Sequence, residues 1–213
     1  MATDVLLYDA YGTLWDVHSV MQRCEACWPG KGVQVSQLWR TKQLEATWLR
    51  SLMGRYVPFS TVTREALEFA CESMGLILDE SQKHGLMAEY LTLATFPDVA
   101  DALMRKVAGR TGILSNGSPD MLEPLVKHSG LKFDAVLSVD EVKVFKPAPR
   151  VYQLAVDRFG VPKERIGFVT SNFWDAAGAK SFGFTVYWIN RGGVAAERLG
   201  FQPDRILKSL AGL

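Results

Sequence analysis

The sequence of 213 residues predicts an α/β protein, with a Rossmann-like, doubly wound parallel sheet and an inserted helical cap subdomain. Three observations predict this fold: short apolar runs recur along the chain, helix-like segments separate most of them, and one long helical stretch follows the first run. The composition is that of a globular protein, with 48% hydrophobic and 22% charged residues. A chain of this length can bury one large core and carry an insertion.

The expected strands are five short runs that are rich in apolar and β-branched residues. Their nearly continuous apolar character indicates strands that are covered on both faces, as in a parallel sheet. They lie at residues 4–9, 110–116, 133–140, 165–172 and 184–190.

Segments with helical spacing lie between the later strands, at residues 119–130, 148–160 and 174–183. Ser118 and Pro119 mark the start of the first segment and Gly130 marks its end. Strands that alternate with helices are typical of a doubly wound sheet, in which ligands bind at the carboxyl ends of the strands.

The stretch after the first strand has a different pattern. Residues 15–97 show almost no strand pattern, and their spacing predicts helices over 35–53, 63–75 and 79–93. We therefore expect a Rossmann-like core domain made of residues 1–14 and 98–213, with residues 15–97 inserted as a helical cap. The functional side chains should then lie at the strand ends that face this cap.

Charge and targeting signals exclude several classes of protein. A formal net charge of +1 gives no electrostatic reason to expect a nucleic acid or a membrane as a partner. No signal peptide is expected, because no basic segment precedes the first apolar run, and no stretch reaches the roughly 20 apolar residues that span a bilayer. Cys24 and Cys27 have metal-like spacing but no second pair nearby, so with Cys71 they are expected to be reduced thiols of a cytoplasmic protein.

Polar side chains follow four of the expected strands. A single Ser, Thr or Asn in such a place is explained equally well as a helix cap. The convergence of so many, with two acids and a lysine among them, indicates a reactive site instead. These residues are Asp9 and Thr13 after the first strand, Ser115 and Asn116 after the second, Lys146 after the third, and Thr170, Asn172 and Asp175 after the fourth.

This order of motifs resembles the haloacid dehalogenase superfamily, in which the first aspartate is a nucleophile and most members are magnesium-dependent phosphatases. Tyr11 stands where those phosphatases usually carry a second acid, and Asn172 lies where they usually place acids that bind magnesium. Phosphoryl transfer needs its charge neutralised, and Mg²⁺ prefers carboxylate oxygens. Because few ionised oxygens are left, we expect no metal. Displacement of a halide from carbon needs only a free carboxylate.

A fuller resemblance is to the L-2-haloacid dehalogenases, and it covers nearly the whole chain. The segments that carry it are 9–16, 38–56, 114–122, 146–155, 170–184 and 189–193. It implies hydrolysis of short (S)-2-haloalkanoic acids to (R)-2-hydroxy acids through an aspartyl ester, without a cofactor, in a homodimer. The alternatives are a phosphatase or phosphonatase of the same superfamily, a fluoroacetate-active dehalogenase, and a catalytically silent scaffold. The scaffold should have lost the nucleophile or its lysine, and both are present.

The resemblance also implies catalytic roles. Asp9 attacks C2 of the substrate and Lys146 pairs with it. Asp175 orients or deprotonates the hydrolytic water, with Thr170 and Asn172 fixing the water by hydrogen bonds, although a helix cap is a rival role for Asp175. Thr13 holds the Asp9 carboxylate, and Tyr152 either donates near the nucleophile or is a core tyrosine.

In the substrate pocket, the resemblance gives Arg40 and Asn116 the leaving halide, which suits an anion. Ser115 and the backbone near Tyr11 would hold the substrate carboxylate. Leu44, Phe59 and Trp174 would line the apolar side of the substrate, although plain core packing explains each of them equally well. Thr41, which stands where the family often has glutamine, would also line the pocket.

Overall fold

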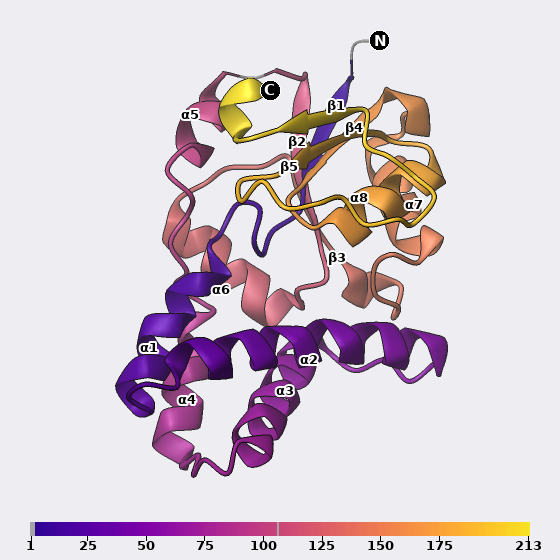
Figure 1. Ribbon diagram of the computed structural model, residues 1–213. Helices are drawn as coiled ribbons and strands as arrows, with labels where there is room; N and C mark the ends of the chain where they lie inside the picture. Colours follow the sequence, from indigo (N-terminus) through magenta and orange to yellow (C-terminus); the bar gives the residue numbers. More distant parts are fainter. Residues whose placement is uncertain (1–2, 106) are drawn as a thin grey trace.

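The computed structural model describes residues 3–105 and 107–213, and it places a six-stranded parallel sheet beside a lobe of helices (Figure 1). The strand order is β3-β2-β1-β4-β5-β6, and every neighbouring pair is parallel. The strands are β1 (Val5–Tyr8), β2 (Arg110–Ser115), β3 (Ala135–Ser138), β4 (Ile166–Thr170), β5 (Thr185–Ile189) and β6 (Arg205–Leu207). The predicted α/β class is confirmed.

The first strand lies in the middle of the sheet because all four of its side chains are apolar or aromatic and buried. It pairs with β2 on one side and β4 on the other, with Tyr8 opposite both Ile113 and Val169. The strand order reverses at β1, which is where doubly wound sheets bind their ligands. The loops that follow β1, β2 and β4 therefore meet at one edge.

The helices that accompany the sheet agree with the predicted segments: α6 (Pro119–Ser129), α7 (Pro149–Phe159) and α8 (Phe173–Phe182). Gly130 ends α6 in the left-handed conformation, with φ of 68°. Short 3₁₀ turns complete this part of the chain at Val17–Ser19, Val139–Glu141, Lys163–Arg165 and Leu210–Gly212. The sequence did not predict α5 (Val99–Met104) or β6, because elements this short give little periodic signal.

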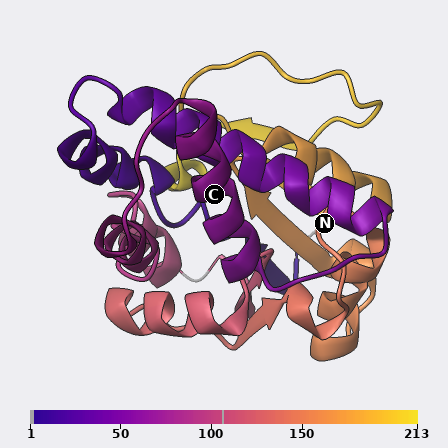
Figure 2. The ribbon, with the colours of Figure 1, turned by 90° about the horizontal axis from the view of Figure 1, so that it is seen from below.

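The lower lobe in Figure 1 consists of α1 (Val20–Cys27), α2 (Gly32–Leu52), α3 (Phe59–Ser73) and α4 (Glu80–Glu89). Figure 2 looks onto this lobe from below, with α2 and α3 in front of the sheet. The indole N–H of the buried Trp39 on α2 donates to Thr63 O on α3 over 2.7 Å. The sequence did not predict α1, which buries only Val20 and Cys24.

Two chain segments connect the lobe to the sheet, and they run side by side. Asp16 N donates to Ala94 O over 2.9 Å, and Phe96 N donates to Leu14 O over 3.0 Å. We propose that the cap begins at residue 15 and ends at residue 97, so that residues 1–14 and 98–213 form the core domain. These paired hydrogen bonds support that division.

Within the part of the chain that the structure describes, no helix is both long and apolar enough to cross a membrane. Nor do three or more His, Cys, Asp or Glu side chains group there as a metal site would need. The three cysteines are free thiols. Burial raises the pKa of Cys24 to about 12 and that of Cys71 to about 11, as it does for unreactive thiols.

Gly178 sets how closely α8 approaches Pro147, in the loop that carries Lys146, and Tyr152 on α7. A Cβ at this position would lie 2.5 Å from Pro147 Cβ and 2.6 Å from Tyr152 Oη. We expect Gly178→Ala to lower the free energy of unfolding by about 1–3 kcal/mol, since overpacking of a close contact forces backbone shifts. Urea denaturation measures this loss. Gly192→Ala is the matched control, because the nearest atom to its Cβ is Val194 Cγ1 at 3.6 Å. Equal losses in both variants would contradict the close packing.

Candidate active site

Asp9 directly follows β1, and its backbone N–H donates to Val169 O over 2.9 Å. Asp9 as a whole is only 6% exposed. One carboxylate oxygen, Oδ1, accepts from Lys146 Nζ at 3.0 Å, and the lysine is itself 1% exposed. A buried carboxylate needs such a partner to stay ionised.

The other oxygen of Asp9, Oδ2, accepts from neutral donors. Asn172 Nδ2 lies at 2.8 Å, Thr13 Oγ1 at 3.1 Å and Thr170 Oγ1 at 3.3 Å. Each hydroxyl also accepts a backbone N–H: Ser171 N donates to Thr13 over 2.8 Å, and Asn172 N donates to Thr170 over 3.1 Å. Because a carboxylate oxygen can only accept, both hydroxyl hydrogens are directed at Asp9 while the hydroxyl oxygens accept from the backbone.

A second carboxylate shares the same lysine. Lys146 Nζ donates to Asp175 Oδ2 over 2.9 Å, and Tyr152 Oη donates to Asp175 Oδ1 over 2.8 Å. Burial alone would lower the pKa of Lys146, but the charges of Asp175 and Asp9 outweigh burial and raise it. Burial raises the pKa of Asp175 to about 6 despite the lysine, and the Asp9 charge adds to the rise. The ammonium thus stays charged between two acids.

The rival roles for Asp175 and Tyr152 can be compared with these contacts. The N-cap position of α8 is occupied by Asn172, whereas the Asp175 side chain is turned to Lys146 and Tyr152. Tyr152 is fully buried, as a core tyrosine would be, yet its hydroxyl bonds the acid. The contacts favour the predicted site over capping.

The loop after β2 joins the same cluster. Asn116 Oδ1 accepts from the backbone N–H of Lys146 over 2.9 Å, which leaves its NH₂ group as the half that can donate. Ser115 Oγ accepts from Gly117 N over 3.0 Å, as a turn residue does. Ser118 does not bond its own helix, and its hydroxyl accepts from Ser60 N of α3 instead.

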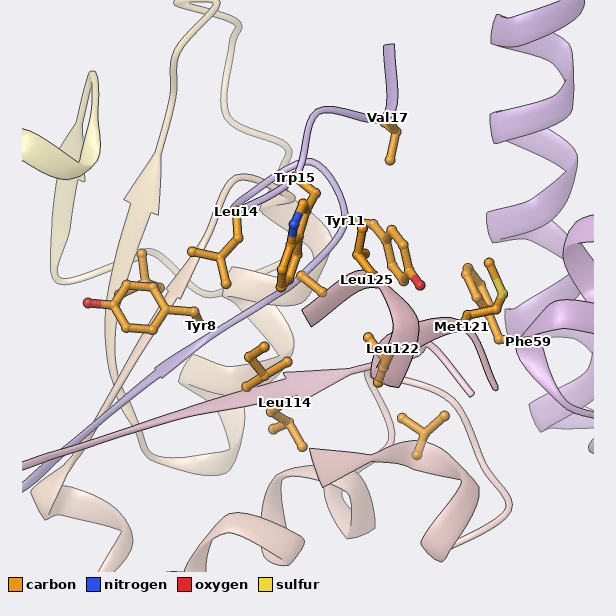
Figure 3. Close-up of a cluster of buried hydrophobic side chains, with 14 of the residues drawn as sticks. Tyr8, Tyr11, Leu14, Trp15, Val17, Phe59, Leu114, Met121, Leu122 and Leu125 are labelled. Atoms are coloured by element: carbon orange, nitrogen blue, oxygen red, sulfur yellow. The ribbon is translucent and has the colours of Figure 1, made fainter. Parts of the chain in front are cut away.

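An aromatic wall closes the side of the site that faces the cap. Figure 3 shows Tyr11 beside Trp15 in the loop after β1, with Phe59 beyond the tyrosine hydroxyl. The ring of Tyr11 lies 5.7 Å from that of Phe59 and 6.1 Å from that of Tyr90. Burial raises the pKa of Tyr11 far above its usual value, so its hydroxyl stays neutral. Its carbonyl accepts from Asn172 Nδ2 over 3.3 Å.

The cap contributes Arg40 from α2. Its Nη1 donates to Gln43 Oε1 over 2.7 Å. Burial lowers the pKa of Arg40, and the groups that counter burial are Tyr90, Asp9 and Tyr11. The Arg40 guanidinium therefore interacts electrostatically with Asp9, and it stays charged at any physiological pH.

The predicted apolar lining is only partly brought together. Trp174 contacts Trp48 edge-on with ring centres 5.5 Å apart, and both line a cavity of about 570 Å³ beside Lys146 and Phe145. Leu44 is half-buried on α2. Thr41 is exposed and its hydroxyl donates back to Gln37 O over 2.9 Å, which gives no support to its predicted place in the pocket.

Residues 3–183 match the haloacid dehalogenase-like hydrolase family. The chain belongs to this family. It is 51% identical to an (S)-2-haloacid dehalogenase of Pseudomonas putida, over 97% of this chain and 92% of the relative. It is 47% identical to haloacetate dehalogenase H-2 of Moraxella sp. (strain B), over 94% of this chain and 92% of that protein.

Solved structures agree with this family membership. A crystallised L-2-haloacid dehalogenase superposes with a TM-score of 0.97 at 44% identity, over 100% of this chain and 97% of the other. The L-2-haloacid dehalogenase from Xanthobacter autotrophicus with chloropropionic acid covalently bound superposes with a TM-score of 0.92 at 40% identity, over 98% and 95% of the two chains. The predicted resemblance and the α/β fold with a cap are confirmed.

Sequence reasoning missed two polar residues that lie behind Arg40. Gln43 and Thr63 are fully buried, and they bond each other. The signal in the sequence was the position of Gln43 in the middle of a predicted helix, on the face where helical spacing otherwise places apolar residues. Without knowledge of what packs against α2, such a residue is read as a solvated one.

We expect the Lys146 ammonium to stabilise the two buried carboxylates of Asp9 and Asp175 beside each other. In Lys146→Met, the carboxylates of Asp9 and Asp175 face each other without a cation, so the free energy of unfolding should fall by about 3–5 kcal/mol at pH 7. The pKa of Asp175, which burial already raises, would then lie further above its unfolded value. The loss is therefore present at neutral pH and shrinks as pH falls and the acids take up protons.

Urea denaturation at pH 7 and at pH 5 measures both parts of this prediction. Lys143→Met is the matched control, because this lysine pairs with Asp140 at the surface with its side chain 61% exposed. Its loss should stay below about 1 kcal/mol at either pH. A loss in Lys146→Met that does not change with pH would argue against two unpaired carboxylates.

Proposed function

We propose that this chain hydrolyses short (S)-2-haloalkanoic acids to (R)-2-hydroxy acids through a covalent ester on Asp9, without a metal ion. One observation carries the proposal: the Asp9 carboxylate is buried and ion-paired with Lys146, and its remaining partners are neutral donors. The relatives at about half identity that are named (S)-2-haloacid dehalogenases support the same activity.

In the first step, Asp9 attacks C2 of the substrate from the side opposite the halogen. The C2–O bond forms as the carbon–halogen bond breaks, the halide leaves with the electron pair, and the configuration at C2 inverts. Arg40 and the NH₂ group of Asn116 take the departing anion, since a guanidinium and an amide suit an anion. Ser115 and the backbone around Tyr11 hold the substrate carboxylate.

In the second step, water attacks the carboxyl carbon of the Asp9 ester. Asp175 takes the proton of this water, and Tyr152 holds the acid in place through its 2.8 Å hydrogen bond. Negative charge that develops on the Asp9 oxygens meets the same donors that hold the free carboxylate: Lys146, Thr13, Thr170 and Asn172. The bond between the carboxyl carbon and the substrate oxygen then breaks, and the expelled alkoxide takes the proton back from Asp175 to give the hydroxy acid. The water oxygen stays on Asp9, whose remaining proton passes to solvent.

The alkyl group of the substrate packs against Leu44, Phe59 and Trp174. Phe59 is 1% exposed and touches Tyr11, whereas Trp174 opens onto the apolar cavity beside Lys146. These contacts support a site that takes short apolar groups at C2.

A phosphatase or phosphonatase of the same superfamily is less well supported. Asn172 presents an N–H donor to Asp9, where a magnesium site would need an oxygen. Tyr11 places a neutral phenol and an aromatic ring where a second acid would stand. Haloacetates, fluoroacetate among them, are a second candidate substrate, because one relative is named a haloacetate dehalogenase.

We further propose a cytoplasmic homodimer that binds neither nucleic acid nor membrane. Apolar side chains are exposed together at the end of α2, where Leu49 is 48%, Leu52 is 84% and Met53 is 64% exposed. Phe69 on α3 is 47% exposed. Such a patch favours association with a second copy. Light scattering in solution tests this, and a monomer at micromolar concentration would exclude it.

The activity is tested by halide release from each enantiomer of 2-chloropropionate. We expect release from the (S) enantiomer by the wild-type protein, unchanged by EDTA, and a loss of at least about 10³-fold in Asp9→Asn, because the nucleophile is removed. No release from any 2-haloacid would refute the activity.

A single turnover in ¹⁸O-labelled water separates the two possible routes. The ester route labels Asp9 in the first turnover, whereas direct attack by water labels the product. Persistent activity in Asp9→Asn, with mass spectrometry excluding deamidation, would rule out the covalent step.

The pH dependence of ester hydrolysis should follow the ionisation of the Asp175 carboxyl. Since burial raises its pKa to about 6, the acid is ionised and able to take a proton above that pH, and it is protonated below. We expect kcat and the single-turnover rate of ester hydrolysis to fall about tenfold per pH unit below pH 6. Circular dichroism over the same range checks that the protein stays folded. A rate that is flat down to pH 5 would remove Asp175 from this role.

A further inference from the structure

A buried chain of hydrogen bonds in the cap starts at Arg40 and ends at the backbone of α3. Arg40 Nη1 donates to Gln43 Oε1 over 2.7 Å, and Gln43 Nε2 donates to Thr63 Oγ1 over 2.7 Å. Thr63 in turn donates to Phe59 O over 2.7 Å. Gln43 and Thr63 are both 0% exposed.

The chemistry of the donors fixes the direction of this chain. An arginine can only donate, so Gln43 must present its carbonyl oxygen to Arg40 and its NH₂ group to Thr63. The single hydroxyl hydrogen of Thr63 goes to Phe59 O, so the Thr63 oxygen is free to accept from Gln43. Gln43 also has a hydrogen-bonding contact with Tyr90, so the orientation of its amide is set by Arg40, Thr63 and Tyr90 together.

A glutamine at this buried position is unfavourable for stability unless its amide is fully bonded. It lies on α2, whose neighbouring buried residues include Val35 and Trp39, and faces α3, which buries Ala66 and Leu67. A buried amide costs stability unless its groups are bonded, whereas an apolar residue of similar size would fill the space without that cost. Thr63 could satisfy its own hydroxyl through the helix alone. The glutamine is therefore explained by the polar groups that it joins: the Arg40 guanidinium, the Thr63 hydroxyl and the Tyr90 phenol.

We propose that Gln43 and Thr63 are positioning residues, which hold the Arg40 guanidinium in the orientation that receives the leaving halide. This inference rests on the proposed function of Arg40. An arginine side chain has much rotamer freedom, and Gln43 removes some of it while occupying only one of the N–H groups. The rest of the planar donor set stays available to an anion.

The chain of hydrogen bonds also joins Arg40 to the aromatic wall formed by Tyr11 and Phe59. Its last acceptor, Phe59 O, belongs to the residue whose ring packs on Tyr11 at 5.7 Å and on Phe145 at 6.2 Å. Phe145 precedes Lys146 in the sequence. The orientation of Arg40 is thus coupled through hydrogen bonds to Phe59, the cap residue that contacts the core-domain loops.

The test uses the leaving group as its readout. Chloride carries its charge on a smaller ion than bromide and leaves carbon less readily, so its departure depends more on a well-placed cation. The value of kcat/KM reports all steps up to the displacement of halide. We expect Gln43→Met to lower kcat/KM for (S)-2-chloropropionate by about 10-fold and Thr63→Val by about 3-fold. The bromide-to-chloride ratio of kcat/KM should rise at least about threefold in Gln43→Met.

Two further variants separate positioning from a general loss of structure. Thr63→Ser keeps the hydroxyl and should restore the wild-type ratio. Thr47→Val is the matched control, since Thr47 is also 0% exposed on α2 and its hydroxyl donates to a helix carbonyl, that of Leu44, over 2.6 Å. It should leave the bromide-to-chloride ratio unchanged even where it lowers stability.

The outcomes are distinguishable. An unchanged ratio in both Gln43→Met and Thr63→Val, or an equal rise in Thr47→Val, overturns the positioning role while the wild type remains an active dehalogenase. Thr63→Val carries the test by itself where Gln43→Met does not fold. A wild-type protein that releases no halide from any 2-haloacid refutes the proposed function instead.

Discussion

The position of one ammonium group governs the rest of the site. Lys146 Nζ lies 3.0 Å from Asp9 and 2.9 Å from Asp175, and all three side chains are buried. Two carboxylates this close could not both ionise in a dry interior without a cation between them. The ring of Phe168, with its centre 4.8 Å from Nζ, covers the lysine from the strand below. The other contacts of the site follow from keeping this trio in place.

The strand order explains how distant segments reach that ammonium. Asp9 follows β1, and Thr170 and Asn172 follow or end β4, its hydrogen-bonded neighbour, so they meet without any long connection. Lys146 comes from the loop beyond β3 at the edge of the sheet, and it has to cross over β2 to reach Asp9. Asn116, at the end of β2, accepts the lysine backbone N–H on the way. The amide therefore has a structural partner as well as its proposed part in binding halide.

Much of this arrangement could be predicted from the sequence, for a physical reason. In a parallel sheet the buried strands are nearly continuous apolar runs, so polar residues at their ends stand out, and Asp9, Lys146 and Asp175 were found in this way. Burial of polar residues inside a helical cap gives no comparable signal, because it depends on which helix packs against which face. Gln43 and Thr63 were missed for that reason. Thr41 is assigned to the pocket by the family resemblance alone, and its side chain is exposed. Ile206, 58% exposed in the short edge strand β6, likewise gave no pattern to read.

The same reasoning explains how the fold can use a carboxylate nucleophile with neutral partners. Among the residues that the structure describes, Lys146 supplies the positive charge within hydrogen-bonding distance of Asp9, and Thr13, Thr170 and Asn172 supply donors that add no charge. A cation that donates through hydrogen bonds leaves the aspartate oxygen able to form a bond to carbon, whereas a divalent ion bound directly to it would hold that electron pair more tightly. The departing halide is a further negative charge to be accommodated, besides the substrate carboxylate. Lys146 is already paired with Asp9 and Asp175, so a second cation must come from outside this cluster. Arg40 of the cap is a cation that interacts electrostatically with Asp9. In the proposed mechanism both lobes are thus needed for one displacement: the core holds the nucleophile Asp9, and Arg40 of the cap receives the halide that it expels.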